Sequence, residues 1–190
     1  SVLVSVLICF VIGVPLGVIA SYNKWYRDIQ NVVLDAMQTL PYFCYLIPVL
    51  MFFGGNIVSA VIATVIYSVP PIIRLTALGL SQVSGGYSEV SKSFGGTGIQ
   101  TLNKVKFPLA VPSLVMGFNQ TVIMAFAMQI VTPLIGGKGL GLQVFNALQR
   151  SDTGRGLSAG LAIVLLAIII DRITHAWTKK QRQALGLDQS

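Results

Sequence analysis

Charge is what this sequence has least of. Only 10% of its 190 residues are Asp, Glu, Lys or Arg, whereas a water-soluble domain usually carries about 25%. Acidic residues are the scarcest, with 6 Asp and Glu against 13 Lys and Arg. Together with 54% apolar residues and a mean hydropathy of +0.76, this deficit excludes an ordinary soluble domain and indicates a membrane protein.

Residues that bind metals or carry out redox chemistry are also rare. His175 is the single histidine, which excludes most histidine-based chemistry, and no zinc or haem spacing occurs. Cys9 and Cys44 both lie in apolar runs, so free thiols are favoured over a disulfide. The sequence shows no nucleophile–base pair, and Asp35, Asp152 and Asp171 are isolated from one another, so we expect no enzyme.

The long apolar runs predict an all-α membrane protein, because the alternating segments of a lipid-facing barrel are missing. We expect one transmembrane domain over residues 1–190, and its five spans lie at about 2–20, 32–53, 57–80, 109–134 and 157–173. Prolines interrupt two of these runs, at Pro41, Pro48 and Pro70-Pro71, and predict kinks. The chain starts inside an apolar run without Met and without a basic leader, which favours a fragment over a signal peptide.

The basic residues predict the orientation in the membrane. If the loop at 21–31, the loop at 81–108 and the tail share one side, that side holds ten Lys and Arg, counting Arg74 and Arg172 near the ends of their spans. The other side holds only Lys138, Arg150 and Arg155. Positive loops stay in the cytoplasm, so we expect the N-terminus outside and the C-terminus and loop 81–108 in the cytoplasm. The net charge of +7 then reflects membrane orientation and not nucleic-acid binding.

Residues 89–110, EVSKSFGGTGIQTLNKVKFPLA, form a polar and punctuated segment between two apolar runs. Glu89 is expected in the first turn of a short helix, where the helix dipole favours an acid. Tyr87, Val90 and Phe94 are spaced to share one face of that helix, and Gly95-Gly96 predicts its end.

After the double glycine, Thr97 to Gln100 reads as a capping box that starts a second helix. The spacing of its apolar and basic residues predicts a helix lying along the membrane surface. Pro108 is expected to set the corner at the start of the next span. An ordinary amphipathic loop remains the alternative interpretation of this pattern.

The same segment resembles the EAA motif of ATP-binding-cassette (ABC) importer permeases, Glu-Ala-Ala, three residues, Gly, nine residues, Ile, one residue, Leu-Pro. Glu89, Gly95 and Pro108 stand at the matching positions, and Val90 and Ser91 replace the two alanines. Val105 and Phe107 replace Ile and Leu, which keeps the apolar character. The resemblance implies that this segment couples the spans to a separate ATPase subunit, through the residues Glu89, Val90, Ser91, Phe94, Gly95 and Pro108.

The resemblance covers nearly the whole chain. Segments such as QTLPYFCYLIPVLMFFGG (38–55), VPPIIRLTALGL (69–80) and LIGGKGLG (134–141) are similar to permeases of the glycine betaine/choline/proline-betaine importers. This implies a type I ABC importer (MetI-like) permease fold and a multi-pass protein of a bacterial or archaeal cytoplasmic membrane. Thr132-Pro133 departs from the small apolar residues common at that place in the family.

Polar side chains inside an apolar span are candidates for a translocation path, since such groups face the bundle interior or a wet cavity. Asn119, Gln120 and Gln129 fit this description, although interhelical hydrogen bonding explains them equally well. Tyr42, Phe43 and Tyr45 near Pro41 could offer ring faces to a quaternary ammonium, with core packing as the alternative. The small residues Gly117 and Thr121, or Gly13 and Gly17, are candidates for close contacts in a dimer.

The sequence holds no Walker A motif, because GGKGLG lacks the following Ser or Thr. We therefore expect no cofactor in this chain, with ATP and Mg bound by partner ATPase subunits. The resemblance also implies an extracytoplasmic solute-binding protein, a second permease copy and contact with membrane lipid. Two other functions stay open: a permease for another small solute such as an amino acid or methionine, and a non-transporting membrane scaffold.

Overall fold

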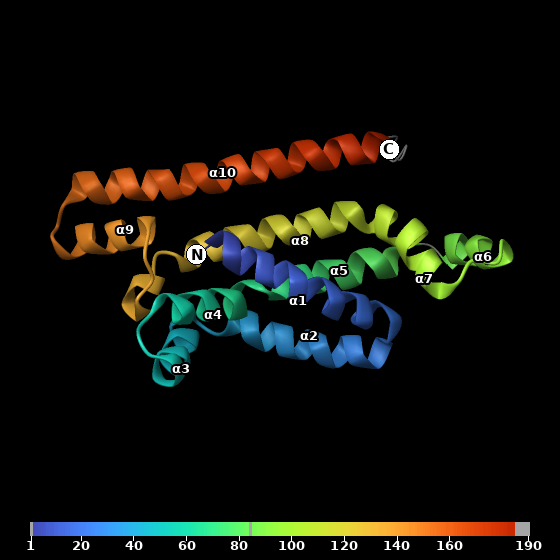
Figure 1. Cartoon of the computed structure of the whole chain (residues 1–190), viewed down its shortest axis with the longest axis horizontal. Helices are drawn as coiled ribbons and strands as arrows, with labels where there is room; N and C mark the ends of the chain where they lie inside the picture. The colour runs from blue at the N-terminus through green and yellow to red at the C-terminus, as the bar shows by residue number, and fades with distance from the viewer. Residues whose placement is uncertain (1, 84, 185–190) are drawn as a thin grey trace.

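The computed structural model describes residues 2–83 and 85–184, and the regular secondary structure in them is helical. The first half holds α1 (Val2–Tyr22), α2 (Lys24–Thr39), α3 (Phe43–Phe53), α4 (Ile57–Ser68) and α5 (Pro70–Gln82). The second half holds α6 (Gly85–Ser93), α7 (Gly98–Thr101), the π-helical turn η1 (Leu102–Lys106), α8 (Phe107–Met128), the 3-10 turn η2 (Thr132–Ile135), α9 (Leu140–Gln149) and α10 (Thr153–Ala184). The long helices follow the long axis of the molecule, with α6 and α9 at opposite ends (Figure 1).

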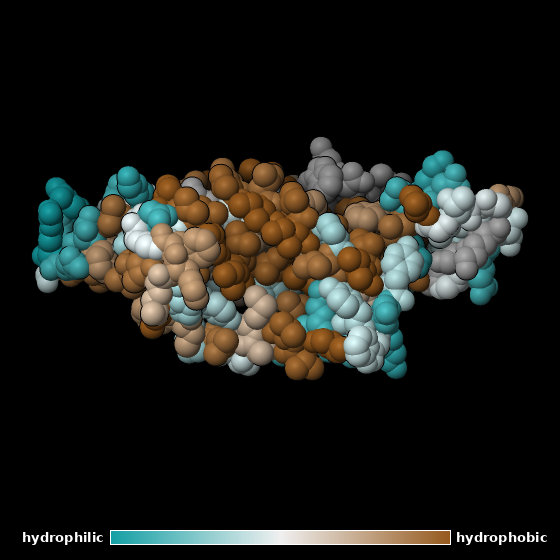
Figure 2. Space-filling view, turned by 60° about the horizontal axis from the view of Figure 1, so that its bottom comes forward, coloured by the Kyte–Doolittle hydropathy of each residue, from teal (hydrophilic) through white to brown (hydrophobic). Residues whose placement is uncertain are grey.

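The helices provide four or five membrane crossings. Four stretches in the described residues are long and apolar enough to span a membrane: Val2–Tyr22, Ile57–Gln82, Gly98–Met128 and Thr153–Ala176. The bent pair of α2 and α3 gives a fifth if it counts as one span. Figure 2 shows the corresponding surface, a broad apolar region in the middle with hydrophilic residues gathered at both ends.

Helix α5 lies at the centre and packs against α1 on one side and α8 on another. Its buried residues occupy most of its surface: Pro70, Pro71, Ile72, Ile73, Thr76, Ala77, Gly79 and Leu80. A helix that is buried nearly all round needs close neighbours, and small residues on α1 and α8 allow that approach.

Glycines on α1 and α8 allow the approach to α5, and the expectation that they mediate dimer contacts is wrong. A Cβ on Gly13 would come within 2.4 Å of Ile72 Cγ2, and one on Gly17 within 2.7 Å of the Ile73 carbonyl oxygen. Gly117 faces the Ile72 backbone in the same way, and Thr121 is buried within the chain. Their surfaces are therefore already used inside one copy.

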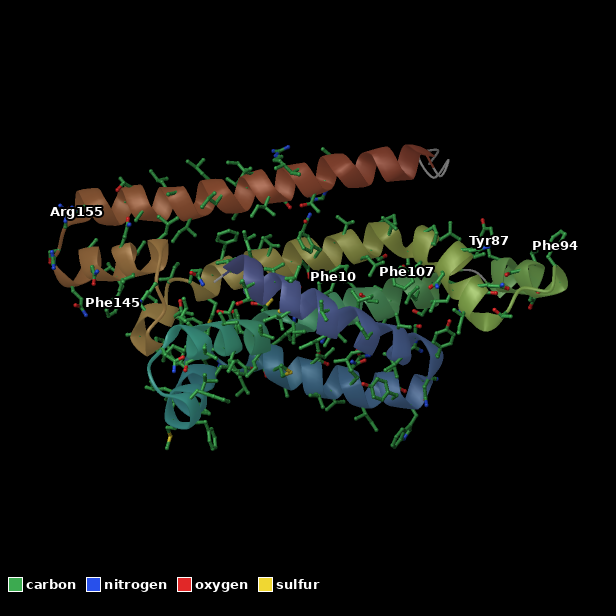
Figure 3. All side chains as sticks on the ribbon, viewed as in Figure 1. Phe10, Tyr87, Phe94, Phe107, Phe145 and Arg155 are labelled. Atoms are coloured by element: carbon green, nitrogen blue, oxygen red, sulfur yellow. The ribbon has the colours of Figure 1, made fainter. Side chains whose placement is uncertain are left out.

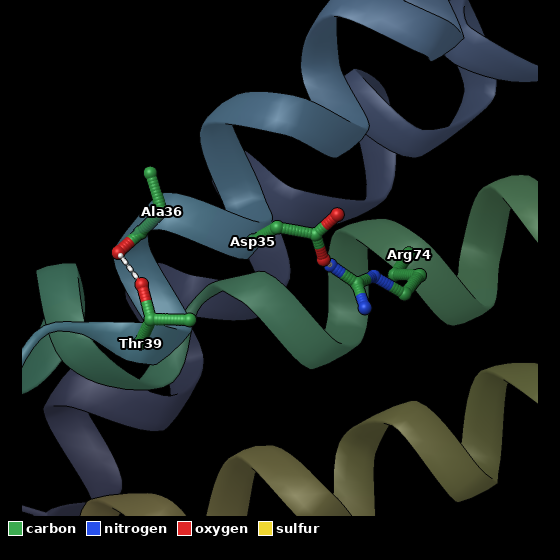
Figure 4. Close-up of polar contacts among 4 residues, drawn as sticks. All are labelled: Asp35, Ala36, Thr39 and Arg74. Carbon is green, nitrogen blue, oxygen red and sulfur yellow. Dashed lines mark hydrogen bonds and ion pairs between the residues drawn. The ribbon is translucent and has the colours of Figure 1, made fainter.

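The second crossing is broken rather than merely kinked. α2 and α3 meet at an angle of 94° across Leu40, Pro41 and Tyr42. Leu40 takes an extended conformation (φ −71°, ψ 131°), as a residue before proline prefers. At the end of α2 the Thr39 hydroxyl donates to the Ala36 carbonyl at 3.0 Å (Figure 4).

The helix boundaries differ from those expected at this crossing. Residues 24–31, expected in a loop, form the first two turns of α2, because the Asn23 side chain caps the helix by accepting from the Tyr26 amide at 3.3 Å. In the next crossing Pro70 and Pro71 begin α5 directly after α4. Val69 stays helical and accepts from the Ile73 amide at 3.4 Å, so Ile57–Gln82 passes as one span.

The expected corner at Pro108 is absent. α7, η1 and α8 follow one another without a break over Gly98–Met128. Pro108 cannot donate to a carbonyl four residues earlier, and a π turn precedes it in which the Phe107 amide donates to Leu102, five residues back. The wider π turn accommodates the missing N–H of Pro108, so the helix continues without a break. At the other end α8 stops at Met128, and the last residues of the expected span 109–134 form turns and η2.

Candidate functional site

The segment that resembles the EAA motif forms a helical hairpin at one end of the molecule, made of α6 and α7 (Figure 1). Gly95 ends α6 with a positive φ of 77°, a conformation that glycine adopts without strain. The Gly96 amide then donates to the Ser91 carbonyl at 2.9 Å, a typical glycine-based helix stop. The predicted end of this helix is therefore found in the structure.

A side-chain contact closes the hairpin. The hydroxyls of Ser91 on α6 and Thr101 on α7 lie 2.8 Å apart, and Thr101 is buried. Thr97 and Gln100 form the predicted capping box, in which the Thr97 amide donates to the Gln100 side chain at 2.9 Å. The Ser91–Thr101 contact links α6 to the long helix that continues into α8.

Glu89 lies elsewhere in α6 than expected. The helix begins at Gly85, so Glu89 falls in its middle and the first turn holds no acid. The Glu89 side chain is exposed, and its backbone carbonyl accepts from the Ser93 hydroxyl at 3.0 Å. Helix-dipole stabilisation thus does not explain this residue.

The apolar face of α6 has no covering within the described chain. Tyr87 and Val90 are more than half exposed, and Phe94 is 89% exposed at the tip of the hairpin. Figure 3 shows Tyr87 and Phe94 projecting from this end of the molecule. An apolar stripe on a short amphipathic helix suits a groove on another protein.

The three polar candidates on α8 lie in different surroundings. Asn119 is 5% exposed, and neither its amide oxygen nor its nitrogen has a hydrogen-bond partner among the described residues. Gln120 is exposed on the adjacent face, whereas Gln129 is buried just after the helix ends. About 15 Å of helix separates Asn119 from Gln129, at about 1.5 Å per residue.

The three aromatic candidates begin α3 after the bend. The Tyr42 and Phe43 rings lie 4.7 Å apart and are exposed. Tyr45 instead donates its hydroxyl to the Met37 carbonyl and packs its ring against Tyr67 at 6.1 Å. Its neighbour Leu46 joins Met128 in one core cluster, so the structure places α3 beside the end of α8 where Gln129 lies.

Sequence reasoning missed a polar stripe on α2. Lys24, Asp28, Asn31, Asp35 and Gln38 recur at helical spacing along one side of the helix, and four of them are exposed. Arg74 reaches from α5 to this stripe, and its guanidinium lies 2.6 Å from the Asp35 carboxylate (Figure 4). The signal was present as opposite charges inside two neighbouring apolar runs.

The end opposite the hairpin is a tightly packed turn. Gly136 has a φ of 90° and lies against the Asn56 backbone, with no room for a Cβ. Asn56 caps α4 by accepting from the Val58 amide at 2.8 Å. The GGKGLG segment, which follows η2, thus packs against the turn before α4. We expected this segment to be a structural turn, and the packing agrees.

The sequence of this chain is similar to those of known membrane transport proteins. The family model described as "Binding-protein-dependent transport system inner membrane component" matches residues 13–183. The chain is 46% identical over 181 residues to the glycine betaine/carnitine transport permease protein GbuB of Listeria monocytogenes, with 95% of this chain and 64% of that protein covered. It is 44% identical over 174 residues to the glycine betaine transport system permease protein OpuAB of Bacillus subtilis, with 92% and 62% covered. The chain thus spans a little under two thirds of the length of these relatives.

A solved structure of similar fold is the inward-facing methionine ABC transporter MetNI. The TM-score is 0.79 at 24% identity, and 92% of this chain and 90% of that chain are covered. The likeness confirms the expected all-α permease fold of type I importers. The chain belongs to the family of binding-protein-dependent transport system inner membrane components.

Proposed function

We propose that this chain is the membrane-spanning subunit of an ATP-driven importer for glycine betaine and related quaternary ammonium solutes. The observation that carries the proposal is the α6–α7 hairpin, whose exposed apolar face ends in Phe94 and whose second arm continues into α8. A partner that grips this hairpin would move α8, and with it the α5 that packs against it. The solute class comes from the relatives at 46% and 44% identity.

The working complex in this proposal has further subunits. ATPase subunits bind ATP and Mg and hold α6 in a groove, with Glu89, Val90, Ser91, Phe94, Gly95 and Pro108 as the coupling residues. A binding protein delivers the solute to the end that carries α9, and a second copy of the permease completes the path. The α6 end lies in the cytoplasm and the N-terminus outside, following the charge bias.

The path in this proposal is lined by polar groups on α8 and aromatic groups on α3. Asn119 and Gln129 are buried, and Gln120 is exposed where a second copy or a wet path can reach it. Tyr42 and Phe43 present exposed rings at the bend, which can attract a quaternary ammonium. Tyr45 supports the bend through its bond to Met37.

Solute uptake into liposomes tests the proposal. The full-length permease is reconstituted with its ATPase and binding protein, and ATP-dependent uptake of radiolabelled glycine betaine, choline, carnitine, proline and methionine is compared. We expect accumulation of at least one quaternary ammonium solute, and no accumulation without ATP. Uptake of an amino acid such as methionine in place of all of these would overturn the solute class, and absence of any flux would support a scaffold.

A further inference from the structure

The side of the molecule that carries α2 holds a pair of opposite charges within the membrane-spanning region. Arg74 lies within the Ile57–Gln82 span, about 12 Å from its Gln82 end at about 1.5 Å per residue. Its side chain is 37% exposed, and that of its partner Asp35 is 63% exposed. A charged pair at such depth is costly against lipid, so this side of the chain faces water or protein in the assembled complex.

A cavity of about 390 Å³ opens beside the pair, between α2 and α5. Its polar lining comes from Arg27, Asn31 and Asp35 on α2 and from Arg74 and Ser81 on α5. Figure 2, which brings this side forward, shows hydrophilic atoms that interrupt the apolar surface here. The cavity holds charges of both signs.

Only some of the hydrogen-bond donors of the Arg74 guanidinium have a partner among the described residues. One terminal nitrogen contacts Asp35, while Nε is buried and has no hydrogen-bond partner among the described residues. A buried donor without an acceptor is unfavourable, and a carboxylate of a ligand could satisfy it. Guanidinium groups bind carboxylates in a two-pronged manner, through neighbouring N–H groups.

We propose that Asp35 and Arg74 form a station on the solute path that binds small zwitterions carrying a carboxylate and a quaternary ammonium. The solute carboxylate displaces that of Asp35 from Arg74 and binds Nε and the terminal nitrogen, and Asp35 then faces the ammonium charge. When the solute leaves, the two side chains pair again, so no charge is left without a counter-charge in the membrane. This inference rests on the proposed function and names the residues that recognise its substrate class.

A purely structural role is the competing explanation, because the pair also ties α2 to α5. The two explanations differ for the double variant Asp35→Asn/Arg74→Gln, whose amides can still bond each other without charge. A structural tie predicts recovery in this variant compared with Arg74→Gln, whereas a zwitterion station predicts continued loss. Arg74→Lys keeps the charge and should retain more activity than Arg74→Gln.

The test uses the complex of permease, ATPase and binding protein in liposomes, and measures glycine betaine imported per ATP hydrolysed. Arg74→Gln should lower this ratio about tenfold or more, the effect of losing one hydrogen bond to a charged group. ATP hydrolysis stimulated by the loaded binding protein should persist, which shows that the variant is folded and assembled. Arg172→Gln, which removes an exposed arginine of α10 outside the cavity lining, should leave the ratio unchanged.

A second measurement does not depend on Arg74 variants. Ser81→Cys places a thiol at the cavity in a Cys44→Ser background, with Cys9 buried. Saturating glycine betaine should slow labelling of this thiol by a water-soluble reagent in the assembled complex.

The outcomes separate the two proposals. If the wild-type complex imports no quaternary ammonium solute, the proposed function fails and the station with it. If it imports choline but no quaternary ammonium zwitterion, only the station is overturned. If the wild type imports glycine betaine but Arg74→Gln keeps the wild-type ratio, or the double variant recovers, only the station is overturned. Labelling at position 81 that glycine betaine does not slow also overturns the station alone.

Discussion

Glycine positions show how single residues set the packing of this bundle. Gly17 brings α1 to the backbone of α5, because a Cβ there would lie 2.7 Å from the Ile73 carbonyl oxygen. Gly160 on α10 is also helical, yet a Cβ there would meet no atom within 4 Å. The two positions form a matched pair of the same substitution in crowded and open surroundings.

Gly17→Ala is expected to destabilise the permease by about 1–3 kcal/mol, the usual effect of overpacking. Gly160→Ala should be neutral or slightly stabilising, since alanine favours a helix over glycine. Thermal unfolding of the detergent-purified variants measures both. Equal unfolding temperatures for the two variants would contradict the packing of α1 on α5.

Gly95 and Gly98 form a second pair, within the hairpin itself. Gly95 has a φ of 77°, whereas Gly98 begins α7 with an ordinary φ, and neither lacks space for a Cβ. Gly95→Ala should strain the hairpin by about 1 kcal/mol and lower ATP-dependent uptake, while the protein still inserts in the membrane. Gly98→Ala serves as the control and should keep wild-type uptake; a loss of similar size in Gly98→Ala would argue against conformational strain as the cause.

At the scale of elements, the hairpin was the most predictable part. The Gly95-Gly96 stop and the capping box of Thr97 and Gln100 are local chemistry, so sequence spacing was sufficient to predict them. Three elements were not predictable in this way. The 94° break after α2 and the continuous helix through Pro108 depend on which of several local backbone geometries forms around the proline, and the salt bridge of Asp35 with Arg74 joins distant segments.

The exposed face of α6 permits a prediction about partner binding. Phe94→Ala removes the most exposed apolar ring of the hairpin without disturbing any packing in the chain. It should weaken binding of the ATPase subunit by about 1–3 kcal/mol, as loss of a buried aromatic anchor at an interface does. Thermal stability of the permease should not change.

Ile99→Ala is the matched control for this prediction. Ile99 is also a large exposed apolar residue of the hairpin, but it lies on α7 and outside the α6 face. ATPase binding to the purified permease, measured by titration, should stay near the wild-type affinity for Ile99→Ala. If both variants bind equally well, the α6 face is not the docking surface.

At the scale of the whole molecule, the core helices connect two separate polar regions. One is the α6–α7 hairpin, and the other is the Asp35–Arg74 pair beside the polar stripe of α2. The hairpin extends α8 and adjoins α5, and α5 carries Arg74 beside the polar stripe of α2. Composition and hydropathy predicted an all-α membrane bundle, because both are sums over many residues. The contact of Asp35 with Arg74 could not be predicted in this way, since it depends on how α2 packs against α5.

The central claim is that a separate ATPase grips the α6–α7 hairpin and so moves the membrane helices. Cross-linking from Phe94→Cys, in a Cys44→Ser background with Cys9 buried, tests it most directly. In the assembled, nucleotide-bound complex we expect the cysteine at position 94 to cross-link to the ATPase subunit and to be shielded from water-soluble thiol reagents. A thiol at position 94 that reacts as fast in this complex as in the permease alone would contradict the account.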